Sequence, residues 1–157
     1  MNAQLKRLSY GGLFLALVTV ATMYIRVPTL IGYANLGDGF ILGSAVLLGP
    51  FAAVVGGVGS ALADLLLGYS IYAPATLVIK GLMGLCAALF IRKGFPFRLL
   101  GFVLAELIMV LGYFAFECFA YTPASALLSV PANLMQGLVG IAVALALNPL
   151  LQRLKER

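Results

Sequence analysis

The sequence predicts an all-α integral membrane protein with six transmembrane helices, both termini in the cytoplasm, and a single membrane domain over residues 1–157. Three observations predict this fold class. Hydrophobic residues make up 63% of the chain and charged residues only 10%, whereas a soluble domain of this size needs far more polar surface. Gly and Pro divide the apolar sequence into helix-sized segments. The basic residues lie at the ends of the chain and in one internal cluster, which is typical of a membrane protein with cytoplasmic ends.

The predicted helices begin and end where the sequence supplies polar or helix-breaking residues. A polar loop over residues 26–38 follows the first helix, and Gly49-Pro50 separates the second from the third. Gly68-Tyr69-Ser70 ends the third helix, and Pro123 precedes the last. These signals place the helices at about residues 8–26, 39–49, 51–68, 73–91, 98–120 and 125–150.

The second segment is short, because about eleven residues rise only ~16 Å against a hydrocarbon core of ~30 Å. It is either tilted or continuous with the third, which would leave five spans. Five spans would place two basic clusters outside the cell, against the positive-inside tendency. Six spans place eight of the ten basic residues in the cytoplasm, namely Lys6, Arg7, Arg92, Lys93, Arg98, Arg153, Lys155 and Arg157.

Two further features of the charge pattern concern targeting and partners. Lys6-Arg7 before an apolar run resembles a signal peptide, but no Ala-x-Ala site follows, so we expect a retained first helix. The net charge is +5, but in a membrane protein the placement of Lys and Arg mainly reflects the orientation of the chain in the bilayer. We therefore expect the bilayer, and no nucleic acid, as a partner.

Polar residues inside apolar helices mark the candidate functional site, since charge in a bilayer is costly unless it faces a cavity or a partner. Such residues are Asp64, Lys80, Glu106, Glu117, Asn133 and Gln136. The predicted topology places most of them in the extracellular half. Spacings of three or four residues put side chains on one helix face. The resulting stripes are Tyr72, Thr76 and Lys80; Tyr113 and Glu117, with Glu106 two turns away; and Asn133 with Gln136.

Each of these residues also has a structural interpretation. Asp64 and Lys80 carry opposite charges on consecutive helices, which favours a structural ion pair over ligand contact, although Lys80 alone remains a candidate anion contact. An equally good interpretation of Glu117 is that its side chain reaches the outer headgroup region of the bilayer. The structural interpretation of Glu106 is that its carboxyl group is protonated and hydrogen-bonds to a neighbouring helix. Asn133 and Gln136 are compatible with helix–helix hydrogen bonding. The tyrosines are as compatible with a membrane-interface belt as with ligand stacking.

Enzymatic chemistry has no sequence support. The chain contains no His, no Gly-x-x-x-x-Gly-Lys-Ser/Thr loop, and no Cys/His cluster. We therefore expect no catalytic residue, no metal site and no cofactor. A small-residue face, Gly12-x-x-x-Ala16 on the first helix, permits close approach of another helix, either within the chain or from another subunit.

Four blocks of sequence resemble the substrate-binding S components of energy-coupling factor (ECF) vitamin transporters. In order they are GYANLGDGFILGSAVLLGP, GSALADLLLGYSIYAPATLVIKGLMG, ELIMVLGYFAFE and NLMQGLVG, which begin at Gly32, Gly59, Glu106 and Asn133. The resemblance implies a six-helix protein of the prokaryotic plasma membrane with an extracellular-facing vitamin pocket closed by the first loop. That loop adds Tyr33, Asn35 and Asp38 to the predicted substrate site.

The resemblance also implies partners and a substrate class. The expected partners are a membrane coupling subunit (T component), which would contact Gly12 and Ala16, and two ATPase subunits. Gly12 departs from the Ala-x-x-x-Ala pattern of the family. The similarity favours pyridoxine or hydroxymethylpyrimidine, with riboflavin as an alternative, and the scarcity of cations favours an unphosphorylated vitamin, since only Lys80 and Arg26 are at hand. Functions of another class are a stand-alone secondary transporter, which would require inverted repeats, and a membrane scaffold.

Overall fold

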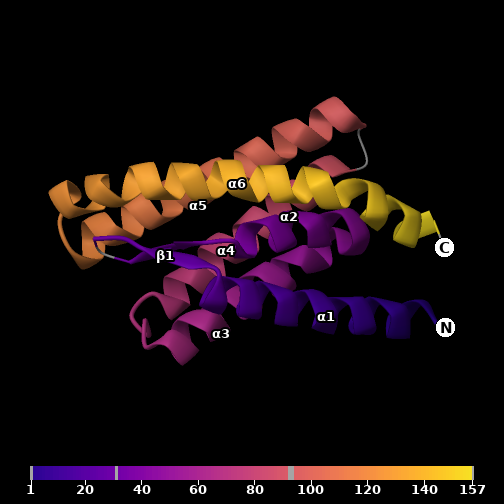
Figure 1. Cartoon of the computed structure of the whole chain (residues 1–157), viewed down its shortest axis with the longest axis horizontal. Helices are drawn as coiled ribbons and strands as arrows, with labels where there is room; N and C mark the ends of the chain where they lie inside the picture. Colours follow the sequence, from indigo (N-terminus) through magenta and orange to yellow (C-terminus); the bar gives the residue numbers. More distant parts are fainter. Residues whose placement is uncertain (1, 31, 92–93, 157) are drawn as a thin grey trace.

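The computed structural model describes residues 2–30, 32–91 and 94–156, which form six α-helices, one short 3-10 helix and one antiparallel hairpin. The helices lie side by side along the long axis of the molecule (Figure 1). The elements are α1 (Ala3–Tyr24), β1 (Arg26–Pro28), β2 (Tyr33–Asn35), α2 (Gly37–Leu48), η1 (Gly49–Phe51), α3 (Ala52–Leu67), α4 (Ala73–Phe90), α5 (Phe95–Ala120) and α6 (Pro123–Glu156).

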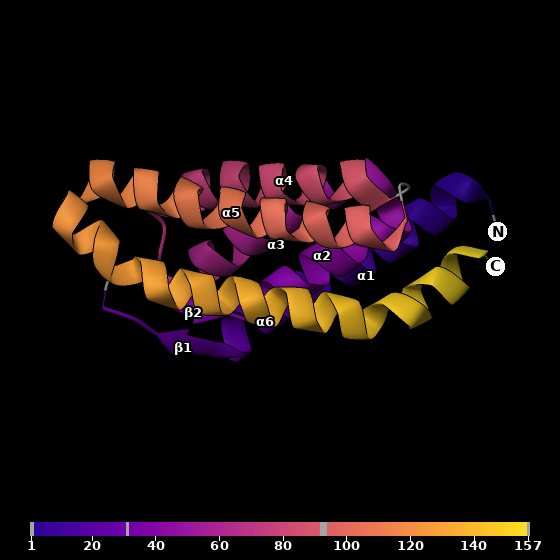
Figure 2. The same ribbon diagram turned by 90° about the horizontal axis from the view of Figure 1, so that it is seen from above.

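The two ends of the bundle carry different parts of the chain. The start of α1 and the end of α6 lie at one end (Figures 1 and 2). The η1 turn lies there too, because one cavity is lined by Arg7 of α1, Pro50 of η1 and Lys155 of α6. The β1–β2 hairpin and the α3–α4 and α5–α6 connections lie at the other end (Figure 1). We call these the terminal end and the hairpin end.

Helices α2 and α3 are separate and fold back on each other. Gly49 has a φ of 60°, a conformation that favours glycine, and α3 returns beside α2 after it. A Cβ built on Gly56 of α3 would lie 2.8 Å from Cγ2 of Ile41 in α2. A single helix continuous through both segments is therefore wrong.

Length and composition identify five candidate membrane spans among the described residues, with Gly37–Leu67, which covers α2, η1 and α3, counted as one. An integral membrane protein follows from this, while the sixth span and the cytoplasmic position of the ends stay predictions. Arg92, Lys93 and Arg157, which entered the prediction of orientation, lie outside the described residues.

The predicted polar loop over residues 26–38 is wrong in detail, because it contains a hairpin. Arg26 pairs with Asn35, and Pro28 with Tyr33, in an antiparallel register. The backbone N–H of Leu36 also donates to the carbonyl of Ile25 at 3.1 Å. Strands of three residues are too short to give a period-two signal in the sequence. The hairpin contacts α1 and α6 and covers one end of the bundle.

Other predicted boundaries are displaced by a few residues. Helix α1 begins at Ala3 and ends at Tyr24, and α5 begins at Phe95, directly after Gly94 at a φ of 92°. Helix α6 is longer than the predicted 125–150 and continues through Pro131 and Pro149. In a membrane protein, neighbouring helices can satisfy the backbone groups that an internal proline frees.

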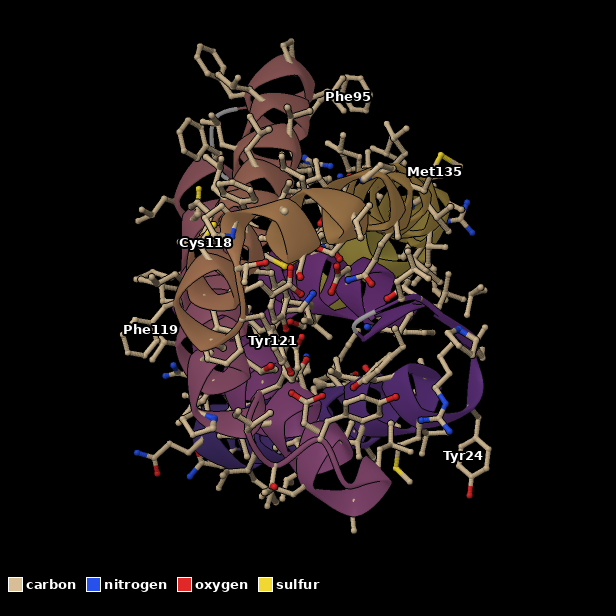
Figure 3. The ribbon with its side chains drawn as sticks, turned by 90° about the vertical axis from the view of Figure 1, so that its left-hand side faces the viewer. Tyr24, Phe95, Cys118, Phe119, Tyr121 and Met135 are labelled. Atoms are coloured by element: carbon tan, nitrogen blue, oxygen red, sulfur yellow. The ribbon has the colours of Figure 1, made fainter. Side chains whose placement is uncertain are left out.

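The core and the outer surface are both apolar, as expected for a protein in lipid. Leu42, Met83 and Phe102 are fully buried, and α3 and α4 approach closely where a Cβ on Gly57 would lie 2.6 Å from the Leu77 carbonyl oxygen. Phe119 is 92% exposed and projects from the periphery (Figure 3). Because the helices carry hydrophobic side chains both toward the core and toward the outside, the buried polar residues are unusual, and their position indicates a functional site.

Candidate functional site

A polar cavity lies at the hairpin end, between α3, α4, α5, α6 and the hairpin. Figure 3 looks onto this end, where Phe119 and Tyr24 point outward and oxygen atoms gather between the helices. The cavity volume is about 40 Å³, enough for about three water molecules. Nine of the eleven predicted substrate-site residues line it, namely Tyr33, Asn35, Tyr72, Thr76, Lys80, Tyr113, Glu117, Asn133 and Gln136.

Local sequence explains how α3 and α4 present their side chains. Gly68, at a φ of 82°, ends α3, and the N–H of Tyr69 then donates to the Asp64 carbonyl at 2.8 Å. This closing turn fixes Asp64 in the last turn of α3. Helix α4 starts directly after Tyr72, and the helical spacing brings Tyr72, Thr76 and Lys80 to the cavity along one face.

The predicted ion pair of Asp64 with Lys80 is wrong. Lys80 pairs with Asp38 at the start of α2, and both side chains are almost completely buried. The sequence argument considered only carboxylates on the neighbouring helix, whereas the fold brings in a carboxylate from a helix that is distant in sequence. The positive charge of Lys80 is therefore already compensated within the protein.

Gln136 extends this ion pair to the hairpin. Its Oε1 accepts from the backbone N–H of Asn35 at 2.7 Å and from Asn35 Nδ2 at 3.3 Å, and its Nε2 donates to Asp38 Oδ2 at 2.6 Å. We call Asn35, Asp38, Lys80 and Gln136 the Asp38 cluster. It joins β2, α2, α4 and α6, so it connects the hairpin to three helices through buried polar contacts.

Asp64, in the last turn of α3, also lines the cavity and is less completely partnered than Asp38. Tyr33 donates its hydroxyl hydrogen to Asp64 Oδ1. Asp64 Oδ2 is buried and has no hydrogen-bond partner in the part of the chain that the structure describes. Burial, followed by the negative charge of Asp64, raises the pKa of Tyr33 well above its ordinary value. Tyr33 is therefore a neutral donor to Asp64 at physiological pH.

Glu117 and the aromatic side chains form the wall near the α5–α6 connection. Ser129 donates to Glu117 Oε2, and Tyr72 donates to Oε1 at 3.3 Å. Burial chiefly raises the pKa of Tyr72, with contributions from Tyr121 and Glu117. Thr76 and Tyr113 share a hydrogen bond of 3.0 Å. Rings with this edge-on and tilted packing offer a flat apolar contact with polar tips.

Two predicted substrate-site residues, Asp38 and Glu106, do not line the cavity. Asp38 lies beneath it in the cluster, and Glu106 is buried against the small residues of α6, where a Cβ on Gly140 would lie 2.7 Å from Glu106 Oε1. Both Glu106 carboxylate oxygens lack a hydrogen-bond partner among the described residues. Glu106 therefore packs between helices in this conformation, away from the cavity wall.

Sequence reasoning missed part of the lining. These residues are Thr22, Thr29, Gly32, Ser60, Tyr69 and Ser129, and Asp64 lines the cavity in addition to its contact with Tyr33. The spacing rule already used for other residues was sufficient for two of them, because Ser60 precedes Asp64, and Ser129 precedes Asn133, by four positions. No sequence signal placed Thr22 or Thr29, because Thr22 lies on α1, where it contacts Asn35 of the hairpin, and Thr29 lies in the turn between β1 and β2.

The predicted partner face lies apart from this cavity. Gly12 and Ala16 are both exposed on α1, and a Cβ built on Gly12 would have no atom within 4 Å. Packing against another helix of the described chain therefore does not occupy this face. Within the described residues no group of His, Cys, Asp and Glu side chains is arranged to hold a metal ion.

Comparison with known proteins indicates the family of this chain. The family model described as "ECF-type riboflavin transporter, S component" matches residues 2–155. A Pyrococcus woesei protein described as "Uncharacterized protein in gap 3'region" is 40% identical over 141 residues, which cover 87% of this chain and 95% of that protein.

A second relative has a functional description. The "Thiamine precursor transporter HmpT" of Lactococcus lactis subsp. cremoris is 36% identical over 102 residues, covering 65% of this chain and 58% of that protein. The family match extends over almost the entire chain, and the helices are long and apolar enough to cross a membrane. The chain therefore belongs to the S-component family of ECF-type transporters, and it is an integral membrane transport subunit for a vitamin rather than an enzyme.

Proposed function

We propose that this chain captures a small, unphosphorylated heteroaromatic vitamin or vitamin precursor on the extracellular side and delivers it with an ATPase-driven coupling module. One observation carries the proposal: a buried polar cavity, covered by a hairpin, lies at a single end of an otherwise apolar bundle. Pockets of this kind, with apolar walls and a few convergent polar groups, are typical of small-molecule sites. In the proposed site, the tyrosines contact the ring and the amide and acidic side chains bind its polar groups.

Hydroxymethylpyrimidine is the substrate that we favour, with pyridoxine second. The relative described as a thiamine precursor transporter supports this order. The charge of the cavity argues against phosphate esters, because Lys80 is paired with Asp38 and the Arg26 guanidinium lies over the Tyr33 ring, at 5.8 Å, without lining the cavity. Recognition of a phosphate group normally uses several free cations.

Riboflavin remains the alternative because the matching family model is described by that vitamin. The cavity of about 40 Å³ must widen for any vitamin. A single-ring compound requires less movement of the hairpin and helices than a three-ring flavin does. The small cavity therefore favours the smaller substrates.

We further propose six membrane spans with both termini in the cytoplasm, so that the hairpin end faces outward. The return of α3 beside α2 brings η1 to the terminal end, together with Lys6 and Arg7. In this orientation the basic residues of the terminal end lie on the cytoplasmic side, in agreement with the positive-inside tendency.

Coupling to the partners is assigned to the exposed small face of α1. We propose that Gly12 and Ala16 contact the membrane coupling subunit, which in turn binds two ATPase subunits. Ala16→Phe is then expected to preserve vitamin binding and abolish uptake in cells that contain the partners, because a bulky side chain prevents close helix approach. Leu107→Phe, at a residue of α5 that is 43% exposed, is the matched control. Loss of binding in Ala16→Phe would show that the face packs internally.

Copurification is the direct test of the proposed function. The protein is extracted in detergent from cells grown with hydroxymethylpyrimidine, pyridoxine and riboflavin, and the bound small molecules are identified by mass spectrometry. Hydroxymethylpyrimidine at about one molecule per chain is expected. Absence of any vitamin, together with no saturable binding of the three compounds by equilibrium dialysis, would favour a scaffold. Accumulation of the vitamin by the purified chain alone in liposomes would instead indicate a secondary transporter.

A further inference from the structure

The charged groups at the cavity differ in how much of their bonding capacity the protein already uses. Asp64, Lys80 and Glu117 are the charged residues that line it in the described part of the chain. Lys80 is paired with Asp38. Both oxygens of Glu117 accept hydrogen bonds, from Ser129 and Tyr72. Only the Asp64 carboxylate keeps an oxygen, Oδ2, without a partner among these groups.

This free oxygen is not a surface feature. The Asp64 residue is 4% exposed, and Oδ2 itself is sealed from solvent. A buried carboxylate oxygen without a donor costs stability, by more than a neutral polar group does. The Thr76 hydroxyl also interacts with Asp64, but it shares its hydrogen bond of 3.0 Å with Tyr113, and no donor among the described residues has hydrogen-bond geometry to Oδ2. The protein therefore provides an acceptor whose donor is absent from the described chain.

The orientation of the carboxylate is fixed by its neighbours. Tyr33 donates to Oδ1 and comes from the hairpin, while the helix end at Gly68 holds the backbone of Asp64. With Oδ1 occupied by Tyr33, the acceptor left for a ligand is Oδ2. Because Tyr33 belongs to the hairpin, the position of the hairpin over the cavity determines which carboxylate oxygen of Asp64 is left for a ligand.

We propose that Asp64 determines substrate specificity by accepting a hydrogen bond from an exocyclic amino group of the bound heteroaromatic ring. This inference rests on the proposed function and narrows it: the preferred ligand carries an amino group on its ring. With Lys80 paired to Asp38, the other two acidic or basic side chains that line the cavity in the described chain, Asp64 and Glu117, are both carboxyl groups, which favours ligands with donors over anionic ligands. An aminopyrimidine has such a donor, whereas pyridoxine has no amino group.

The test compares two ligands of the same size with the purified full-length chain. The probes are 4-amino-5-hydroxymethyl-2-methylpyrimidine and its 4-oxo analogue, in which an oxygen acceptor replaces the amino donor. Affinities are measured by isothermal titration calorimetry. The wild-type protein is expected to bind the amino compound at least about tenfold more tightly, the effect of one buried hydrogen bond to a charged group.

Asp64→Asn makes the test specific to this residue, because the amide has the same shape. The Tyr33 hydroxyl selects the amide oxygen as its acceptor, so the amide NH₂ takes the position of Oδ2 and becomes a donor. We expect about a 10- to 100-fold loss of affinity for the amino compound and a preference that vanishes or reverses toward the 4-oxo analogue. Unfolding temperature in detergent, measured without ligand, reports whether the variant is folded.

The possible outcomes separate this inference from the proposed function. An unchanged preference in a folded Asp64→Asn protein would show that Asp64 is structural and would overturn the inference, while the proposed function stands. Equal wild-type affinities for the two probes, or binding of pyridoxine alone, would overturn the inference without any variant. Failure of the wild-type protein to bind either probe, pyridoxine or riboflavin would overturn the proposed function itself.

Discussion

The Asp38 cluster and the Asp64 side of the cavity place the same residue type in contrasting surroundings. Asp38 accepts from Lys80 and from Gln136, so both of its oxygens are used within the protein. The Asp64 carboxylate accepts from Tyr33 at Oδ1, whereas no described residue donates to Oδ2. Both aspartates are nearly fully buried. The comparison indicates that burial alone does not identify a ligand contact, and that unused bonding capacity in a side chain that lines the cavity is the better guide.

The largest effect is expected from a substitution in the Asp38 cluster, where both carboxylate oxygens of Asp38 already accept hydrogen bonds within the protein. Lys80→Met removes the cation and leaves Asp38 as an unpaired buried carboxylate, which should lower the free energy of unfolding by about 3–5 kcal/mol. Thermal unfolding of the detergent-solubilised protein measures this change.

The double variant Asp38→Asn with Lys80→Met is the matched control, because it removes both charges. It should recover most of the lost stability, since the penalty arises from the isolated charge rather than from the lost pair. Equal stability of the single and the double variant would contradict the assignment of the cluster as a structural ion pair.

An intermediate effect should distinguish the two amides of α6. Gln136→Leu removes the contacts to Asn35 and Asp38, so it should weaken vitamin binding by about 1–3 kcal/mol and also loosen the hairpin. Asn133→Leu should weaken binding by a similar amount while the hairpin stays protected. Calorimetry measures the affinities, and limited proteolysis reports on residues 26–35. If neither substitution changes the affinity, both amides are structural only.

The smallest effect is expected from removing the Tyr33 hydroxyl, which donates a hydrogen bond to Asp64. The pKa of Tyr33 is raised in the folded state, so the unfolded chain ionises first, near pH 10. Stability from this group is complete below about pH 10 and declines as pH rises further. Tyr33→Phe should remove about 1 kcal/mol at pH 7 and make the decline above pH 10 shallower.

Unfolding temperatures between pH 8 and pH 11 measure this dependence. The pKa of Tyr72 is raised too, so some decline should persist in Tyr33→Phe, and Tyr72→Phe provides the comparison. Identical pH dependence in the wild-type protein and Tyr33→Phe would contradict the buried, neutral state of Tyr33.

The extent to which the sequence predicted the site depends on how each residue reaches it. Tyr72, Thr76 and Lys80 share one helix face, so a spacing rule was sufficient to group them. The partner of Lys80 was wrongly predicted, because the pairing with Asp38 joins α4 to α2 over 42 positions of sequence. Glu106 was grouped with Glu117 by spacing, but α6 covers it and keeps it from the cavity.

The sequence by itself determined that the chain lies in a membrane, that it is helical, and which side chains need a partner. Apolar composition, Gly and Pro breaks and helical spacing are local properties, and each follows from a few neighbouring residues. Only the tertiary structure decided how these side chains pair. The fold brings the hairpin, α2, α4 and α6 together, so that Lys80 and Gln136 contact Asp38, while Asp64 Oδ2 has no donor in the described part of the chain. The physical reason is that hydrogen bonds and ion pairs act over a few ångströms in space, whatever the separation along the chain.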